Sequence, residues 1–175
     1  TQWAAIDYGF AAPFCALWFA RTPDGSRLFI YRELYGPGWR AGEQAQRILA
    51  SNGGAKIVWY MADPSMFAKR RETVGDSIAD EYKVAGIELT KANNDRIAGV
   101  NAWHEALAWT EGDGGAVLSY PRVQIFDSCL NLIRTLPSLP GDPMRPEDVD
   151  TSAEDHAFDA GKYGLLADRA LASRQ

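Results

Sequence analysis

The stretch that most constrains the fold is an apolar run near the start of the chain, WAAIDYGF at residues 3–10, which carries one carboxylate, Asp7. It shows no regular alternation of polar and apolar residues, which is typical of a strand buried on both faces near the centre of a sheet. An ionised carboxylate there is costly unless a cation or hydrogen-bond donors meet it. Gly9 marks a point where the backbone turns or a ligand approaches closely. From this stretch alone, a ligand and a turn cap are equally good interpretations of Asp7.

The composition is that of a globular protein. With 175 residues, 46% hydrophobic and 23% charged, we expect residues 1–175 to form a single domain. The longest apolar run, residues 10–20, is too short to span a membrane and contains Pro13, so no membrane partner is expected. Cys15 and Cys129 match no metal-ligand spacing, and we predict buried free thiols in a reducing compartment.

The net charge of −5 gives no direct argument for a nucleic-acid partner. It does not exclude one either, because divalent cations bound to clustered carboxylates reverse the local sign of charge.

The first part of the chain predicts two acidic strand ends that lie side by side. Strands over residues 3–10, 12–21 and 26–34 are joined by short turns and predict an antiparallel meander. A helix over 41–52 ends at Gly53-Gly54, and the apolar run 56–62 predicts a strand that stops at Asp63-Pro64. A right-handed crossover places this strand parallel to the first and beside it. Asp63 and Asp7 would then be neighbours.

The second part predicts shorter elements and a closing helix. We expect helices over 77–83, 93–109 and 128–136, and short strands over 86–89, 116–120 and 122–126, with a hairpin-type turn at 111–115. In the last element, residues 150–172, Ser152 and Asp155 have capping-box spacing. Asp155 and Asp159 are four apart on one helix face, with His156 within a turn of Asp159. Like charges at that spacing destabilise an isolated helix, so a metal ion would compensate for them.

The carboxylate set Asp7, Asp63, Asp155 and Asp159 is the best candidate for chemistry. Hard cations such as Mg²⁺ or Mn²⁺ prefer oxygen ligands with open positions for water and phosphate. Two such ions about 3.5–4 Å apart can activate a water and stabilise the leaving oxygen in phosphodiester cleavage. The competing interpretation is a set of turn caps and surface charges. His156 could serve as a neutral ligand or orient water or phosphate.

Other motifs are weaker or missing. The basic run Lys69-Arg70-Arg71 is a solvated face in the simplest interpretation and a phosphate-contacting patch if the carboxylate site is real. The chain has no G-x-x-x-x-G-K-[ST] loop, so it is not expected to hydrolyse nucleoside triphosphates.

Residues 148–166, DVDTSAEDHAFDAGKYGLL, resemble the closing motif of phage terminase large subunits, in the nuclease domain of the DNA-packaging motor. That motif is an Asp/His-rich cluster followed by D-A-x-R-Y. The segments WAAIDYG at 3–9 and YMADPSMF at 60–67 occupy the first and second acidic positions of the same domain, and residues 126–150 resemble its lead-in segment. The resemblance spans nearly the whole chain.

The resemblance implies an α/β, RNase H-like fold with a mixed five-stranded central sheet flanked by helices, and an extra β-hairpin. It implies a two-metal-ion endodeoxyribonuclease that cuts concatemeric double-stranded DNA at the initiation and termination of packaging. The packaging ATPase domain would lie outside this chain, which begins at Thr1 without a signal-like segment and is expected to be a piece of a longer protein.

Carried over by position, Asp7, Asp63 and Asp159 take the three metal-binding acid positions, with Asp7 bridging two Mg²⁺ or Mn²⁺ ions. Asp155 competes with Asp159 for the third position, and His156 supports the site. Lys162 stands where Arg is commoner, and with Lys69, Arg70 and Arg71 it is a candidate DNA contact.

The implied partners are double-stranded DNA, the packaging ATPase domain, the small terminase subunit and the portal. The implied location is the host cytoplasm, and the protein would be absent from the mature virion. Two alternatives stay open: another RNase H-like nuclease such as a Holliday-junction resolvase, and a non-cleaving domain that docks on DNA or the portal.

Overall fold

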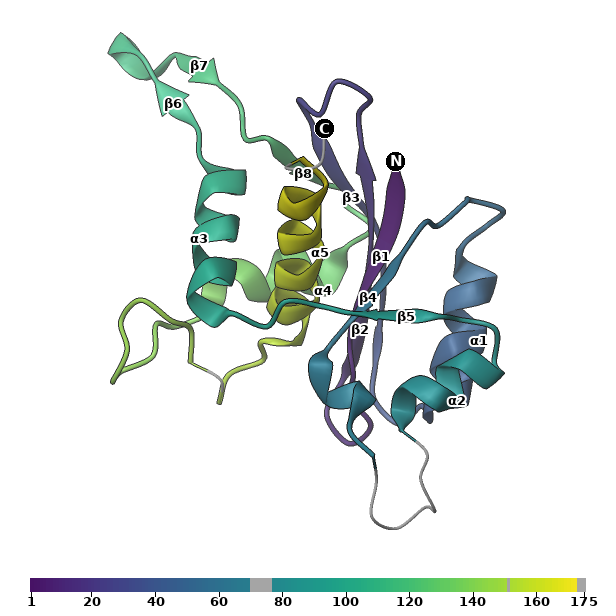
Figure 1. Cartoon of the computed structure of the whole chain (residues 1–175). Helices are drawn as coiled ribbons and strands as arrows, with labels where there is room; N and C mark the ends of the chain where they lie inside the picture. The colour runs from purple at the N-terminus through teal and green to yellow at the C-terminus, as the bar shows by residue number, and fades with distance from the viewer. Residues whose placement is uncertain (70–76, 151, 173–175) are drawn as a thin grey trace.

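A mixed six-stranded sheet with helices on both faces forms the centre of the molecule (Figure 1). The computed structural model describes residues 1–69, 77–150 and 152–172. The strand order is β5-β4-β1-β2-β3-β8, so β1 lies inside the sheet. Helices α1 and α2 cover one face, and α3, α4 and α5 cover the other.

The strands of this sheet are β1 Gln2–Asp7, β2 Phe14–Arg21, β3 Leu28–Gly36, β4 Tyr60–Ala62, β5 Leu89–Lys91 and β8 Val123–Ile125. The first three pair antiparallel, whereas β4 runs parallel to β1, β5 parallel to β4, and β8 parallel to β3. The helices are α1 Ala41–Ser51, α2 Ile78–Val84, α3 Arg96–Leu107, α4 Leu130–Thr135 and α5 His156–Ala172, with short 3₁₀ turns η1 Pro64–Phe67, η2 Asp113–Gly115 and η3 Leu136–Ser138. A separate hairpin pairs β6 Thr110–Glu111 with β7 Val117–Ser119.

The predicted α/β fold is confirmed, including the antiparallel meander and the parallel placement of β4 beside β1. The sheet has six strands instead of the expected five. The short strands expected over 116–120 and 122–126 belong to different sheets, because β7 folds back onto β6 whereas β8 buries Val123 and pairs with β3. The hairpin projects away from the sheet beyond the end of α3 (Figure 1).

The closing helix starts later than its sequence predicts. Its first residue is His156, so Asp155 precedes the helix and the expected capping box between Ser152 and Asp155 is wrong. The backbone N–H of Ser152 instead donates to the carboxylate of Asp150 at 2.8 Å, which closes a turn. Serine and aspartate favour both turns and helix N-caps, and at residues 150–152 they form a turn.

The central strand β1 separates two hydrophobic cores. Trp3 and Ala5 point into the core beneath α3 and α5, whereas Ala4 and Ile6 point into the core beneath α1 and α2. Side chains alternate between the faces of a strand, so a strand covered on both faces is apolar at every position. This explains the unbroken apolar run. Asp7 has the parity of Trp3 and Ala5, and it therefore faces α5.

Two glycines allow α5 to lie directly on its neighbours. A Cβ atom on Gly164 would lie 2.1 Å from Phe19 of β2, and one on Gly161 would lie 2.0 Å from Trp103 of α3. The indole N–H of Trp3 donates to the carbonyl of Gly164 at 3.2 Å, and its ring stacks on Phe19 with centroids 5.4 Å apart. This close packing sets the position of the start of α5 relative to the end of β1.

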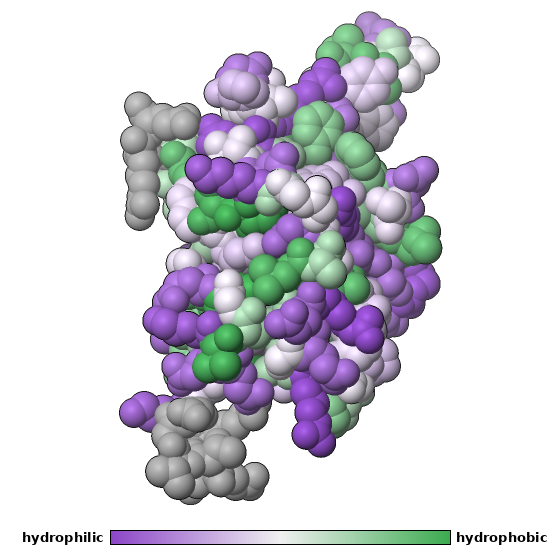
Figure 2. Space-filling model, turned by 90° about the vertical axis from the view of Figure 1, so that its right-hand side faces the viewer, coloured by the Kyte–Doolittle hydropathy of each residue, from purple (hydrophilic) through white to green (hydrophobic). Residues whose placement is uncertain are grey.

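The outer surface on the side of α1 and α2 is mixed in character. Figure 2 shows hydrophobic areas separated by hydrophilic ones across this face. Within the described part of the chain, no helix is both long and apolar enough to cross a membrane. Cys15 and Cys129 are buried free thiols, as predicted.

The close packing of α5 predicts opposite effects for one substitution at two helical glycines. Gly164→Ala should lower the free energy of unfolding by about 1–3 kcal/mol, since overpacking exceeds the gain in helix propensity. Gly42→Ala in α1, where an added Cβ meets nothing within 4 Å, should raise it by up to about 1 kcal/mol. Urea denaturation of both variants measures the difference. A Gly164→Ala protein as stable as the wild type would contradict the close contact between α5 and β2.

Candidate functional site

Two carboxylates lie side by side at one end of the sheet. Asp7 is the last residue of β1, and Asp63 directly follows β4. In the parallel pairing of these strands Ile6 lies opposite Ala62, and the N–H of Asp63 donates to the carbonyl of Ile6 at 3.2 Å. The neighbouring strand ends predicted from the sequence are confirmed.

The start of α5 brings three further site candidates to the same place. Nδ1 of His156 lies 3.0 Å from Oδ2 of Asp7, which joins the first residue of α5 to the end of β1. Asp155 is buried just before the helix, and its carbonyl accepts the N–H of Asp159 at 2.8 Å. The helix therefore presents His156 and Asp159, from its first turn, to the two strand ends.

The pKa shifts of these groups show that they interact electrostatically. Burial raises the pKa of Asp7 to about 6, and the negative charges of Asp159 and Asp63 add to the rise. Burial and the charge of Asp159 also raise the pKa of Asp155. The hydrogen bond with Asp7 raises the pKa of His156. The positive end of the α5 dipole lies at this point and offsets part of the accumulated negative charge.

Asp63 and Asp159 each have a partner within the protein. Oδ2 of Asp63 accepts a hydrogen bond from the hydroxyl of Tyr163, and Oδ1 accepts the N–H of Ser65, which caps η1. Burial alone would raise the pKa of Asp63, but these hydrogen bonds outweigh it and lower the pKa below its usual value. Oδ1 of Asp159 lies 2.7 Å from Nζ of Lys162, although this contact lacks hydrogen-bonding geometry.

The arrangement can be tested against the needs of a divalent cation. In residues 1–69, 77–150 and 152–172, no three His, Cys, Asp or Glu side chains are spaced to enclose an ion. The donor chemistry nevertheless fits, since carboxylate oxygens are the ligands that Mg²⁺ and Mn²⁺ prefer. Rotation of Asp7 and Asp63 away from His156 and Tyr163 would free their oxygens for an ion.

The structure corrects the role expected for Lys162. Its side chain is fully buried, so in this structure it is not exposed for contact with DNA. Lys69 is exposed and lines a hollow beside α2. Arg70 and Arg71 lie outside the described residues, and their contact with DNA stays a prediction.

Sequence reasoning gave no part in the site to Asn94 and Tyr163, which the structure joins to the acids. The side-chain oxygen of Asn94 accepts hydrogen bonds from Lys162 at 3.0 Å and from Tyr163 at 3.3 Å. Lys162 and Tyr163 follow Asp159 by three and four positions, so the helical repeat could have placed both next to it. The sequence offered Asn94 or Asp95 as the cap of the helix over 93–109; Asp95 caps α3, and Asn94 lies in the loop before it.

The segment that leads into α5 is held by ion pairs. Arg96 at the start of α3 contacts both carboxylate oxygens of Asp148 through Nε, at 2.8 and 3.0 Å. Closer to the helix, Glu154 accepts hydrogen bonds from Arg134 and from the hydroxyl of Tyr35. These contacts fix the approach of the chain to His156.

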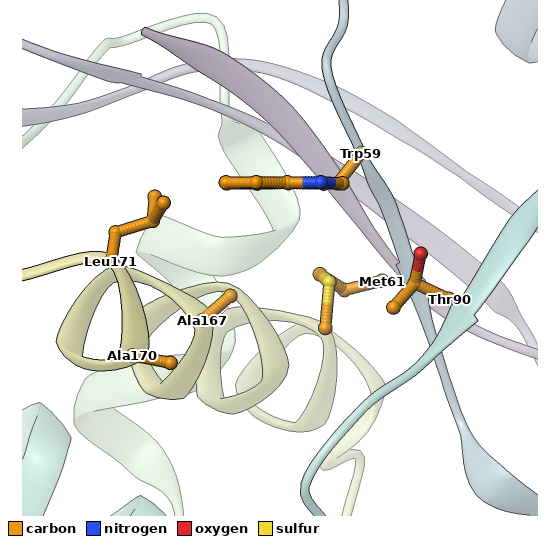
Figure 3. A pocket seen from close by; sticks show the side chains of 6 residues that line it. All are labelled: Trp59, Met61, Thr90, Ala167, Ala170 and Leu171. Carbon is orange, nitrogen blue, oxygen red and sulfur yellow. The ribbon is translucent and has the colours of Figure 1, made fainter. Parts of the chain in front are cut away.

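An apolar pocket of about 130 Å³ lies away from these acids, between the second half of α5 and strands β4 and β5. Figure 3 shows Trp59, Met61 and Thr90 on the side of the strands, with Ala167, Ala170 and Leu171 of α5 opposite them. None of these side chains is titratable, so the pocket offers no acid, base or metal ligand for a reaction.

Comparison with known proteins shows the fold. No protein-family model matches the sequence, and no curated protein matches it. Among solved structures, the P22 large terminase nuclease domain superposes with a TM-score of 0.71 at 16% identity, covering 96% of this chain and 81% of that one. The large terminase nuclease domain of bacteriophage SPP1, solved with bound Mn, gives a TM-score of 0.67 at 15% identity, covering 96% and 86%.

A large terminase from a thermophilic bacteriophage, solved in complex with ADP, gives a TM-score of 0.73 at 18% identity, over 94% of this chain. This chain spans 39% of the length of that thermophilic-phage protein. At these identities the likeness shows the fold alone, which is the RNase H-like fold of large terminase nuclease domains.

The Arg96–Asp148 pair predicts a pH-dependent contribution to stability. Burial raises the pKa of Asp148, but its hydrogen bonds with Arg96 and the N–H of Val149, together with the charges of Arg96 and Lys162, outweigh this and hold the pKa below the usual 3.8. Breaking a buried pair costs about 3–5 kcal/mol. Since the Arg96 side chain is 28% exposed, we expect Asp148→Asn to lower the free energy of unfolding by roughly 1–3 kcal/mol at pH 7.

The sign of the pH effect follows from the lowered pKa. The contribution is present above the carboxyl pKa of the unfolded chain and is lost as pH falls through the lower pKa of the folded state. Urea denaturation at pH 7, 5 and 3 should therefore show the difference between wild type and Asp148→Asn shrinking at the lowest pH. Asp127→Asn, at an exposed acid, serves as the control and should show little difference throughout. A constant difference for Asp148→Asn would contradict the ionic contribution.

Proposed function

We propose that this chain is a large terminase nuclease domain, which cuts concatemeric double-stranded DNA with divalent metal ions at the initiation and termination of viral genome packaging. The observation that carries the proposal is the convergence of Asp7, Asp63 and Asp159 from three separate elements at one end of the sheet. The fold of the P22, SPP1 and thermophilic-phage proteins supports it, as does the Mn bound in the SPP1 nuclease domain.

The three acids would divide the binding of two Mg²⁺ or Mn²⁺ ions. Bound there, the ions would activate a water and stabilise the leaving oxygen of a phosphodiester. The charges of Asp63 and Asp159 both raise the pKa of Asp7, which supports our assignment of Asp7 as the ligand that the two ions would share. Asp63 and Asp159 would each hold one ion.

Asp159 is a better third ligand than Asp155. The charge of Asp159 is among the largest contributions to the raised pKa of Asp7. Asp155 also lies outside the helix, where its carbonyl accepts the N–H of Asp159. Asp155 would then support the helix start and add negative charge around the ions.

His156 is the partner that Asp7 has within the protein. Its hydrogen bond at 3.0 Å orients the Asp7 carboxylate and places a cationic or hydrogen-bonding group against it. With ions bound, His156 would be free to orient a water or a phosphate oxygen at the same position. Lys69, Arg70 and Arg71 would contact DNA phosphates.

The setting of this activity is also part of the proposal. The chain spans 39% of the thermophilic-phage large terminase, and we assign the ATP-driven steps to a packaging ATPase domain outside it. The small terminase subunit and the portal would be the further partners, in the host cytoplasm, and the protein would be absent from the mature virion.

Cleavage of plasmid DNA in Mn²⁺ tests the assignment. The wild-type chain should linearise the plasmid, and Asp7→Asn, Asp63→Asn and Asp159→Asn should each lower the rate by more than about 100-fold, the upper end of the loss for an outer-shell partner of a metal. Asp127→Asn, which changes an exposed acid after β8, should cut at the wild-type rate. Equal cleavage by the wild type and Asp7→Asn would remove the site assignment.

Two other outcomes would select the alternatives. Faster cleavage of four-way junctions than of linear duplex would indicate a resolvase. Binding to DNA without cleavage, together with no binding of Mn²⁺ by calorimetry, would indicate a docking domain that has kept the fold.

A further inference from the structure

We propose that Lys162 is a positioning residue of the metal site. Its buried ammonium holds Oδ1 of Asp159 and would leave the other oxygen of this carboxylate for a metal ion. The inference rests on the proposed function, in which Asp159 binds a divalent ion, and it concerns how the protein prepares that ligand.

Lys162 is completely enclosed by the protein. Its side chain has no exposed surface, which is rare for lysine unless the charge is paired. Nζ lies 2.7 Å from Oδ1 of Asp159 and 3.0 Å from the side-chain oxygen of Asn94, and it lies 4.8 Å from the ring centroid of Tyr163. In the described part of the chain, Asp159 is its one ion-pair partner.

The two oxygens of Asp159 have different surroundings. Oδ1, beside Lys162, is buried without a hydrogen bond, yet the Asp159 side chain as a whole is 16% exposed. The exposed part therefore lies on the remaining atoms of the side chain. An ammonium on one oxygen leaves the other oxygen available, and outer-shell partners of this kind orient metal-binding carboxylates.

The contacts of Lys162 reach the second acid as well. Asn94 accepts hydrogen bonds from both Lys162 and the hydroxyl of Tyr163, and this hydroxyl also contacts Oδ2 of Asp63. A continuous path of side chains therefore joins Asp159 on α5 to Asp63 at the end of β4. Displacement of the ammonium would disturb both carboxylates.

Helix α3 provides the space in which the lysine lies. A Cβ atom on Gly99 would be 2.3 Å from Cγ and 2.4 Å from Cδ of Lys162, so the aliphatic stem passes directly over this glycine. Glycine inside a helix costs about 0.5–1 kcal/mol relative to alanine. A glycine is needed at position 99 despite this cost, because a larger side chain would occupy the space of Lys162.

Calorimetric titration of the 175-residue chain with Mn²⁺ alone tests the proposal without relying on activity. Lys162→Met should weaken Mn²⁺ binding by about tenfold, within the range for loss of an outer-shell partner. Lys162→Arg, which keeps the charge, should retain more of the affinity than Lys162→Met. Gly99→Ala should also weaken binding, because it moves the lysine without removing it. Lys83→Met, at an exposed lysine paired with Glu88, is the matched control and should bind as the wild type does.

The outcomes separate this inference from the proposed function. If the wild type binds no Mn²⁺, the proposed function fails. If the wild type binds and Lys162→Met binds equally or more tightly, Lys162 is a mere competitor or a structural lysine, and the positioning role is overturned while the metal site stands. Circular dichroism of each metal-free variant confirms folding. Should Lys162→Met not fold, an unchanged Mn²⁺ affinity in Gly99→Ala would overturn the proposal.

Discussion

The site depends on one carboxylate placed where water can hardly reach it. Asp7 ends a strand that has a neighbour on each side and helices over each face, and it is 8% exposed. Burial raises its pKa to about 6, yet near neutral pH the group is still mostly ionised. Such a charge requires a counter-charge close by. His156 places a cationic or hydrogen-bonding ring 3.0 Å from it, so α5 both covers the core and provides a partner for the end of β1.

The sequence predicted the central strand and its acidic neighbour because the relevant signals are local. An unbroken apolar run identifies a strand that is covered on both faces, and Pro64 ends the later strand β4. The right-handed crossover then places β4 beside β1, and therefore Asp63 beside Asp7. The start of α5 and the place of β8 could not be predicted in this way. Serine favours a turn as well as a helix cap, and Ser152 forms a turn. A strand as short as β8 carries too few residues to show which strand it pairs with, and its place beside β3 is seen only in the fold.

The direction in which buried polar side chains point also could not be predicted from the sequence. Most of α5 is buried, so helical spacing alone could not tell whether Lys162 faces DNA or the interior. Gly9 shows a similar ambiguity. Its close approach is to the carbonyls of Ala12 and Pro13, and its own carbonyl accepts a hydrogen bond from the buried amide of Gln44. Gly9 therefore allows its own loop to fold closely. The sequence was equally consistent with the close approach of a ligand at this position.

The hydrogen bond between Asp7 and His156 joins residues 149 positions apart in the chain. Contacts between such distant residues form late, because a long loop must close before they can contribute. During synthesis, the strands that carry Asp7 and Asp63 emerge before α5 exists. A nascent chain therefore holds two of the acids without the third, and the complete set appears only when the closing helix docks. In this architecture the order of synthesis separates the first two acids from the third.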